Sequence, residues 1–208
     1  GVACADCHMP YERVGSLKVS GPLHPNLQGF EHFRGCMGVF PGFIGNGYYD
    51  WTKITDGVQS QCTTYATTQT VDDALSLIAS AGGSPWFAYV AFNAPHAPFH
   101  KPPQALHTYS LPSDIASHIP IHVKATTQAL DTEIGRLFTM LGPGVLANTY
   151  VIFVGDNGTD KQATTAPSNP NHAKGTVYEG AINVPLIISG PGVATGECDA
   201  LVSITDIF

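Results

Sequence analysis

The stretch most informative about the fold is Tyr150-Val151-Ile152-Phe153-Val154-Gly155-Asp156-Asn157-Gly158, a short apolar run that ends in turn-forming residues. A run that is rich in β-branched and aromatic residues and bounded in this way predicts a buried strand. Residues 86–92 and 184–188 are runs of the same kind. Because near-continuous apolarity is typical of strands covered on both faces, the three runs predict a mostly parallel sheet flanked by helices.

Two helices are predicted beside these runs. One begins at Thr70-Val71-Asp72-Asp73, which resembles a capping box, and continues to Gly82. The other spans about residues 121–141, where apolar side chains recur at helical spacing, and Gly142-Pro143 stops it. The alternation of helices and strands predicts an α/β sandwich.

The composition narrows the class of protein. The chain has 208 residues, of which 43% are hydrophobic and 12% charged, as in globular proteins. A formal net charge of -7 without any Lys/Arg cluster argues against nucleic acid as a partner. No apolar run reaches the roughly 18 residues that a membrane span needs, and the first residues do not resemble a signal peptide.

Polar residues follow the predicted strands, where open α/β sheets bind ligands. Asp156 and Asn157 offer a carboxylate and an amide oxygen, which suit Ca²⁺ or Mg²⁺, and Gly158 would allow a tight turn. The alternative is a plain Asp-Asn-Gly turn.

Four further residues carry charge or exchange protons. His96, between two prolines, could donate to an anionic oxygen or act as a general acid, or it could be a structural loop histidine. His100 and Lys101 either add positive charge or belong to a solvated loop. Lys174, before Gly175, suits one oxygen of a sulfate or phosphate, or lies on the surface.

Taken together, five motifs in one order resemble the sulfatase family of the alkaline-phosphatase superfamily. They are residues 29–35, 91–98, 130–137, 151–158 and 174–188. The resemblance implies an alkaline-phosphatase-like fold, with residues 21–208 as the C-terminal part of a catalytic domain. It also implies that Asp156 and Asn157 bind a divalent cation, usually Ca²⁺, and that His96 and Lys174 contact the sulfate of a small-molecule or carbohydrate sulfate ester.

The family's remaining machinery is not found in this sequence. The Cys/Ser-x-Pro-x-Arg motif that supplies the nucleophile is missing, since Pro10 and Arg13 follow Cys7 at the wrong spacing. The family also places two metal-binding aspartates near its N-terminus. We therefore expect a partial domain that depends on a missing segment or partner chain. A non-catalytic anion-binding module, or a phosphatase or phosphonate hydrolase of the same superfamily, remains an alternative.

Residues 1–20 form a separate short segment with a Cys-x-x-Cys-His motif made of Cys4, Cys7 and His8. This spacing attaches c-type haem, and the segment resembles a haem-binding segment of multihaem cytochrome c nitrite reductases. The alternatives are a cysteine pair that is unused or redox-active, and a zinc site. The rival function is thus that of an electron-transfer cytochrome. Both resemblances imply a periplasmic or extracellular protein.

We predict that the purified chain alone hydrolyses no sulfate ester, because it carries no recognisable nucleophile motif. Sulfate release from an aryl sulfate is the measurement, with His96→Ala as the comparison. Robust turnover that disappears in the variant would refute the prediction.

Overall fold

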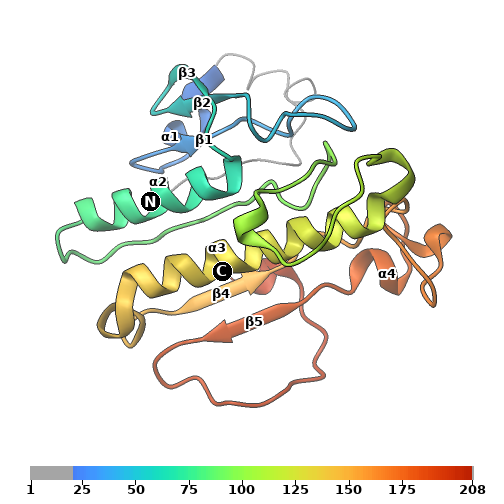
Figure 1. The fold of residues 1–208 in the computed structure, drawn as a ribbon. Coiled ribbons are helices and arrows are strands. Elements are labelled where there is room, and N and C mark those ends of the chain that lie inside the picture. The colour runs from blue at the N-terminus through green and yellow to red at the C-terminus, as the bar shows by residue number, and fades with distance from the viewer. Residues whose placement is uncertain (1–20, 208) are drawn as a thin grey trace. The chain divides into compact units, whose positions relative to one another are not determined.

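The computed structural model describes residues 21–207, which belong to two compact units (Figure 1). The first unit ends at Met140 and the second begins at Leu141. The helices are α1 (His24–Leu27), α2 (Ala66–Ser80), α3 (Ile119–Leu146) and α4 (Glu179–Ile182). The strands are β1 (Arg34–Gly35), β2 (Trp51–Thr55), β3 (Val58–Cys62), β4 (Val151–Val154) and β5 (Leu186–Ser189). Short 3-10 helices cover Gly21–Leu23, Gln104–Leu106, Ala116–His118, Pro170–His172 and Ile204–Ile207.

The first unit contains a three-stranded antiparallel sheet in the order β1-β2-β3. Asp56 and Gly57 form the two-residue turn between β2 and β3, both with positive φ (46° and 86°). Such a turn matches the twist of a hairpin, and Asp-Gly is one of the sequences that adopt it. The sequence analysis did not predict this sheet.

Helix α2 begins one turn earlier than predicted. It starts at Ala66, after Tyr65, which makes no side-chain cap. The capping box expected at Thr70 is wrong, because the Thr70 hydroxyl donates to the carbonyl of Ala66 (2.9 Å), four residues back inside the helix. The predicted end is close, since the last helical residue is Ser80.

Helix α3 confirms the second predicted helix and its stop. Gly142 leaves the helical conformation with a φ of 75°, a value that favours glycine, and Pro143 begins a further short turn that ends at Leu146. The division between the two units falls within one residue of this kink, at Met140 and Leu141.

A buried carboxylate joins α2 to α3. Glu133 of α3 is 2% exposed and accepts hydrogen bonds from the Thr68 hydroxyl of α2 (2.6 Å) and from Arg136 Nε (2.6 Å). Arg136 in turn contacts the Asp72 carboxylate (2.8 Å) and donates to the Thr68 carbonyl (3.2 Å). One ion pair and two hydrogen bonds therefore link the two helices.

An aromatic core fills the space between the sheet, α2 and the loop before Ala94. Its buried members are Cys36, Phe40, Tyr48, Trp51, Tyr65, Ala66 and Ala94. The Phe40 ring meets Tyr48 edge-on with centroids 4.8 Å apart, an arrangement that aromatic pairs prefer. This packing ties residues 36–66 to the loop that contains His96.

The second unit contains the two-stranded antiparallel sheet β4-β5, with Val151 opposite Ser189 and Val154 opposite Leu186. Two of the three predicted strands therefore form. The expected burial is wrong for them, because Ile152, Phe153 and Ile187 are 44%, 40% and 60% exposed.

The parallel sheet is not found in the part of the chain that the structure describes, where both sheets are antiparallel. The third predicted strand, residues 86–92, forms no strand. Residues 86–90 alternate between half-buried and exposed, as in an extended segment, and Phe87 is 62% exposed. Residues 90–92 are all half-buried. A strand needs a hydrogen-bonded neighbour, and an apolar run does not reveal whether it has one. Among residues 21–207, no helix is long and apolar enough to span a membrane.

We predict that Glu133→Gln lowers the free energy of unfolding of the first unit by about 2 kcal/mol, because an ion pair with one buried partner is replaced by an amide. Urea denaturation followed by circular dichroism measures this change. Asp131→Asn is the matched control, since Asp131 is an exposed carboxylate on the same helix. Equal stability of the two variants would contradict the role assigned to Glu133.

Candidate functional site

The turn after β4 is continuous with the sheet of the second unit. Gly155 N donates to the carbonyl of Pro185 (3.0 Å) and Gly158 N to the carbonyl of Ala181 (2.8 Å), so backbone bonds continue beyond the strand end. Between them, the exposed Asp156 accepts a hydrogen bond from Asn157 N on Oδ1 (2.8 Å). The predicted pair thus lies at the carboxyl end of β4, as the sequence analysis expected.

Gly158 serves a different purpose from the one predicted. Its φ is not positive, and a Cβ at this position would overlap the backbone of Gly180 and Ala181. Gly180 is similarly confined, since its Cβ would lie 2.7 Å from the His172 carbonyl oxygen. The two glycines therefore permit three backbone segments to approach one another closely.

Lys174 lies beside this turn. Its backbone N donates to the Thr159 carbonyl (2.9 Å), which joins the segment after Asn157 to the segment that carries the lysine. Gly175 follows with a φ of 90° and turns the chain. The Lys174 side chain is half-buried. Two of the sequence-predicted segments are therefore adjacent within one unit.

The oxygen donors at this turn are of the type that a hard cation prefers. They are too few to complete its coordination. Asp156 and Asn157 provide oxygen atoms, but Ca²⁺ takes six to eight ligands. No group of three or more His, Cys, Asp and Glu side chains that could hold a metal exists within residues 21–207. A cation at this turn would thus need further ligands from elsewhere or from water.

His96 belongs to the first unit, in a loop fixed by hydrogen bonds. Its N donates to the Asn93 carbonyl (2.8 Å), and its carbonyl accepts from the Tyr48 hydroxyl (2.9 Å). The ring Nδ1 lies 2.8 Å from the Ala97 carbonyl oxygen. Because a carbonyl only accepts, Nδ1 carries the hydrogen, and Nε2 is the atom that can exchange a proton. The meeting of His96 with Lys174 stays a prediction, since the two belong to different units.

His100 does not add positive charge, and both interpretations offered for it from the sequence are wrong. It is 3% exposed, its ring stacks on Tyr48 with centroids 4.0 Å apart, and burial lowers its pKa to about 4. Nδ1 donates to the Pro98 carbonyl (2.8 Å), and Nε2 accepts from the Tyr65 hydroxyl (3.1 Å). The ring is therefore neutral and structural. Lys101 is exposed.

A second buried histidine supports the same loop from α3. His122 is fully buried, and its Nδ1 donates to the His100 carbonyl (3.3 Å). Its Nε2 has no hydrogen-bond partner among the described residues, and burial lowers its pKa. The loop that carries His96 is thus anchored by two neutral histidines.

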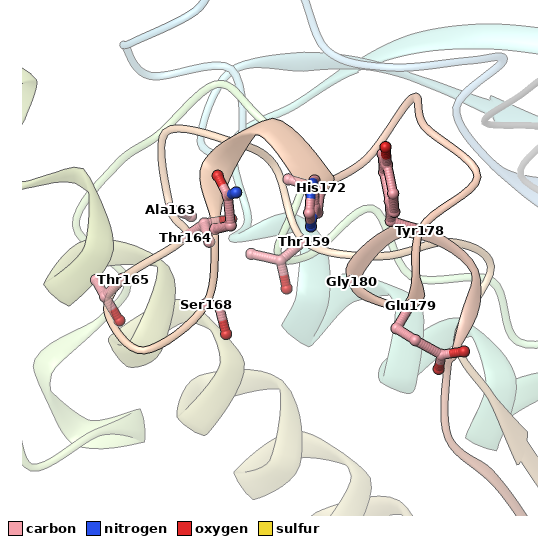
Figure 2. Close-up of a pocket in the computed structure, with 11 residues that line it drawn as sticks. Thr159, Ala163, Thr164, Thr165, Ser168, His172, Tyr178, Glu179 and Gly180 are labelled. Atoms are coloured by element: carbon pink, nitrogen blue, oxygen red, sulfur yellow. The ribbon is translucent and has the colours of Figure 1, made fainter.

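The structure also reveals a cavity that the sequence analysis missed. It measures about 430 Å³ and lies in the second unit, between the loop at residues 159–173 and the start of α4 (Figure 2). The residues that line it are Thr159, Ala163, Thr164, Thr165, Ser168, Asn169, His172, Ala173, Tyr178, Glu179 and Gly180. Residues 159–171 are polar and contain prolines, which is typical of an exposed loop and does not by itself indicate a pocket.

Cys4, Cys7 and His8 lie outside the described residues. The haem, zinc and redox interpretations of this motif therefore stay predictions from the sequence.

Comparison with known proteins identifies one family. The profile of the family described as Sulfatase matches residues 14–208. The match excludes Cys4, Cys7 and His8, and it gives no support to a haem protein. The N-acetylgalactosamine-6-sulfatase of Mus musculus is 31% identical over 208 residues, which is 89% of this chain and 38% of the relative. A protein named Sulfatase from Formosa agariphila is 33% identical over 126 residues, or 56% and 23% of the two chains.

Solved structures agree on the fold. The crystal structure of Ps i-CgsB matches with a TM-score of 0.66 and 24% identity, over 81% of this chain and 41% of that one. A second structure of the same protein, in complex with k-i-k-neocarrahexaose, gives a TM-score of 0.66 at 23% identity. The alkaline-phosphatase-like fold is thereby supported. The chain spans about a quarter to two fifths of the length of these curated relatives.

We predict that the first unit loses stability as the pH falls from about 6.5 to 4. An unfolded histidine binds a proton near pH 6.5, whereas folded His100 stays neutral until about pH 4, so acid favours the unfolded state. The loss amounts to about 3 kcal/mol, at 1.36 kcal/mol for each unit of pKa difference. Urea midpoints measured between pH 7 and 4 test this dependence.

His100→Gln should reduce this pH dependence, and His118→Gln should retain it, because His118 is exposed. An unchanged slope in His100→Gln would show that another group causes the acid sensitivity.

Proposed function

Because this chain belongs to the sulfatase family, we propose that it forms part of the catalytic domain of an enzyme that hydrolyses sulfate esters. One observation supports this most directly: the hydrogen bond from Lys174 N to the Thr159 carbonyl (2.9 Å) joins the lysine segment to the Asp156-Asn157 turn. The Lys174 cation and the pair proposed to bind a metal thereby lie on neighbouring segments. Such a combination suits a sulfate group with its several anionic oxygens.

Lys174 and His96 have distinct roles in this proposal. Hydrolysis breaks the bond between sulfur and the bridging oxygen, and the leaving alcohol needs a proton. Lys174 stabilises charge on the sulfate oxygens as a point charge. In its doubly protonated form, His96 donates the Nε2 proton to the bridging oxygen, while Nδ1–H stays bound to the Ala97 carbonyl and the ring is left neutral. Neither residue is the nucleophile.

Asp156 and Asn157 would hold a divalent cation, Ca²⁺ or Mg²⁺, in the complete site. Their oxygen atoms fit such a cation in type, and the remaining ligands would come from outside the described residues. When bound, the cation would supply a positive charge that stabilises the developing charge on the ester. Asp156 would then be oriented by its bond to Asn157 N.

We further propose a carbohydrate sulfate as the substrate. The mouse relative is named for N-acetylgalactosamine-6-sulfate, and one structural neighbour was solved with a carrageenan hexasaccharide. A sulfated polymer of this kind is met outside the cytoplasm, which agrees with a periplasmic or extracellular enzyme.

A non-catalytic anion-binding module is the second candidate function. It would use Lys174 and the Asp156-Asn157 turn to bind an anion without hydrolysing an ester. Binding of a sulfate ester without turnover, in a protein that contains the whole catalytic domain, would distinguish this module from the enzyme.

We predict that Lys174→Ala weakens binding of k-i-k-neocarrahexaose to the chain about tenfold or more, because one charge-assisted hydrogen bond is lost. Isothermal titration calorimetry measures the affinity. Lys161→Ala is the matched control, since Lys161 is an exposed lysine of the same unit. Equal effects of the two substitutions would leave Lys174 without a specific role.

A further inference from the structure

The cavity in the second unit has the size and the lining of a ligand site. At about 430 Å³ it falls within the range of small-molecule pockets, about 300–1,000 Å³. Every residue that lines it lies between Thr159 and Gly180, so the pocket belongs to the second unit alone. Figure 2 shows side chains from the loop on one side and Tyr178 and Glu179 on the other.

The lining combines polar and apolar surface and carries no lysine or arginine. Thr159, Thr165 and Ser168 contribute hydroxyl groups, which both donate and accept. Asn169 accepts from Asn171 N on Oδ1 (2.9 Å), which leaves its Nδ2 as a donor for a ligand. An anion would find no strong cation in this pocket. An uncharged ligand with many hydroxyl groups matches it better.

The Glu179 carboxylate is already engaged. It accepts a hydrogen bond from Asn183 Nδ2 (2.9 Å), which orients it. Its remaining lone pairs can accept from a ligand hydroxyl, and its charge repels an anion. Both properties again favour a neutral, hydroxyl-bearing ligand.

Two aromatic rings form one side of the pocket. The His172 and Tyr178 rings stack with centroids 3.7 Å apart and an angle of 18° between their planes. Tyr178 remains 52% exposed, so part of its ring is open to a ligand. A flat aromatic face packs against the C–H face of a sugar ring, while the phenol hydroxyl can hydrogen-bond at the edge.

The pocket borders the backbone of the segment that carries Lys174. Ala173, which lines it, directly precedes Lys174, and Thr159 holds Lys174 N through its carbonyl (2.9 Å). A sugar ring in the pocket would therefore lie beside the backbone segment that carries Lys174.

We propose that this pocket binds an uncharged sugar ring next to the ring whose sulfate Lys174 contacts. The inference rests on the proposed function for the position of the sulfate. It assigns Thr165, Ser168, Asn169 and Tyr178 as specificity-determining residues, and it makes the neutral part of the substrate a source of affinity.

The test uses the carrageenan hexasaccharide and its chemically desulfated form, titrated into the full chain by calorimetry. Tyr178→Ala should weaken binding of both forms at least about tenfold, whereas Lys174→Ala should weaken only the sulfated form. Thr165→Val, which removes one hydroxyl at constant shape, should weaken both forms less. Tyr150→Ala is the matched control, since Tyr150 is 63% exposed in the same unit and does not line the pocket.

The outcomes separate the two proposals. The sugar pocket is refuted if Tyr178→Ala and Thr165→Val bind both forms with the affinity of the unsubstituted chain. It is also refuted if the unsubstituted chain does not bind the desulfated form. If Lys174→Ala binds the sulfated form normally while Tyr178→Ala loses both forms, the pocket stands and the sulfate assignment fails. A circular dichroism spectrum of each variant controls for misfolding.

Discussion

The carboxylate of Glu133 is the interaction on which the first unit depends. A buried charge is tolerated only when it is paired and hydrogen-bonded, so α2 and α3 must keep the spacing that places Thr68 and Arg136 around it. Helix α3 also carries His122, which donates to the His100 carbonyl in the loop of His96. The position of the candidate acid thus depends on a helix that an ion pair holds in place.

The fold could be predicted where local chemistry decides it. Gly142-Pro143 stops α3 because glycine adopts the positive φ found there and proline cannot continue the hydrogen bonds. The Asp56-Gly57 hairpin was also readable, but its strands are polar on one face and the apolar-run criterion overlooked them. The strand predicted at residues 86–92 does not form, although the run is apolar. Strand formation depends on a partner that the run itself does not specify.

The candidate site was only partly readable. Asp156, Asn157 and Lys174 could be proposed as site residues because their motifs are contiguous, and the hydrogen bond from Lys174 N to the Thr159 carbonyl makes their segments neighbours. The burial of His100 could not be predicted from the sequence. It results from packing against Tyr48 and Tyr65, which lie far away in sequence. The pocket was hidden for the same reason: its two sides come from separate segments that meet only where Gly158 and Gly180 allow it.

The two-stranded sheet of the second unit affects how the chain behaves at high concentration. Ile152, Phe153, Ile187 and Ile188 are all 40% exposed or more, and within residues 21–207 each strand pairs on one side only. Apolar strands with open edges are templates for intermolecular β-association. Repulsion from the net charge of -7 opposes this association, and salt screens the repulsion. The chain should therefore be handled at low ionic strength, because added salt favours its precipitation.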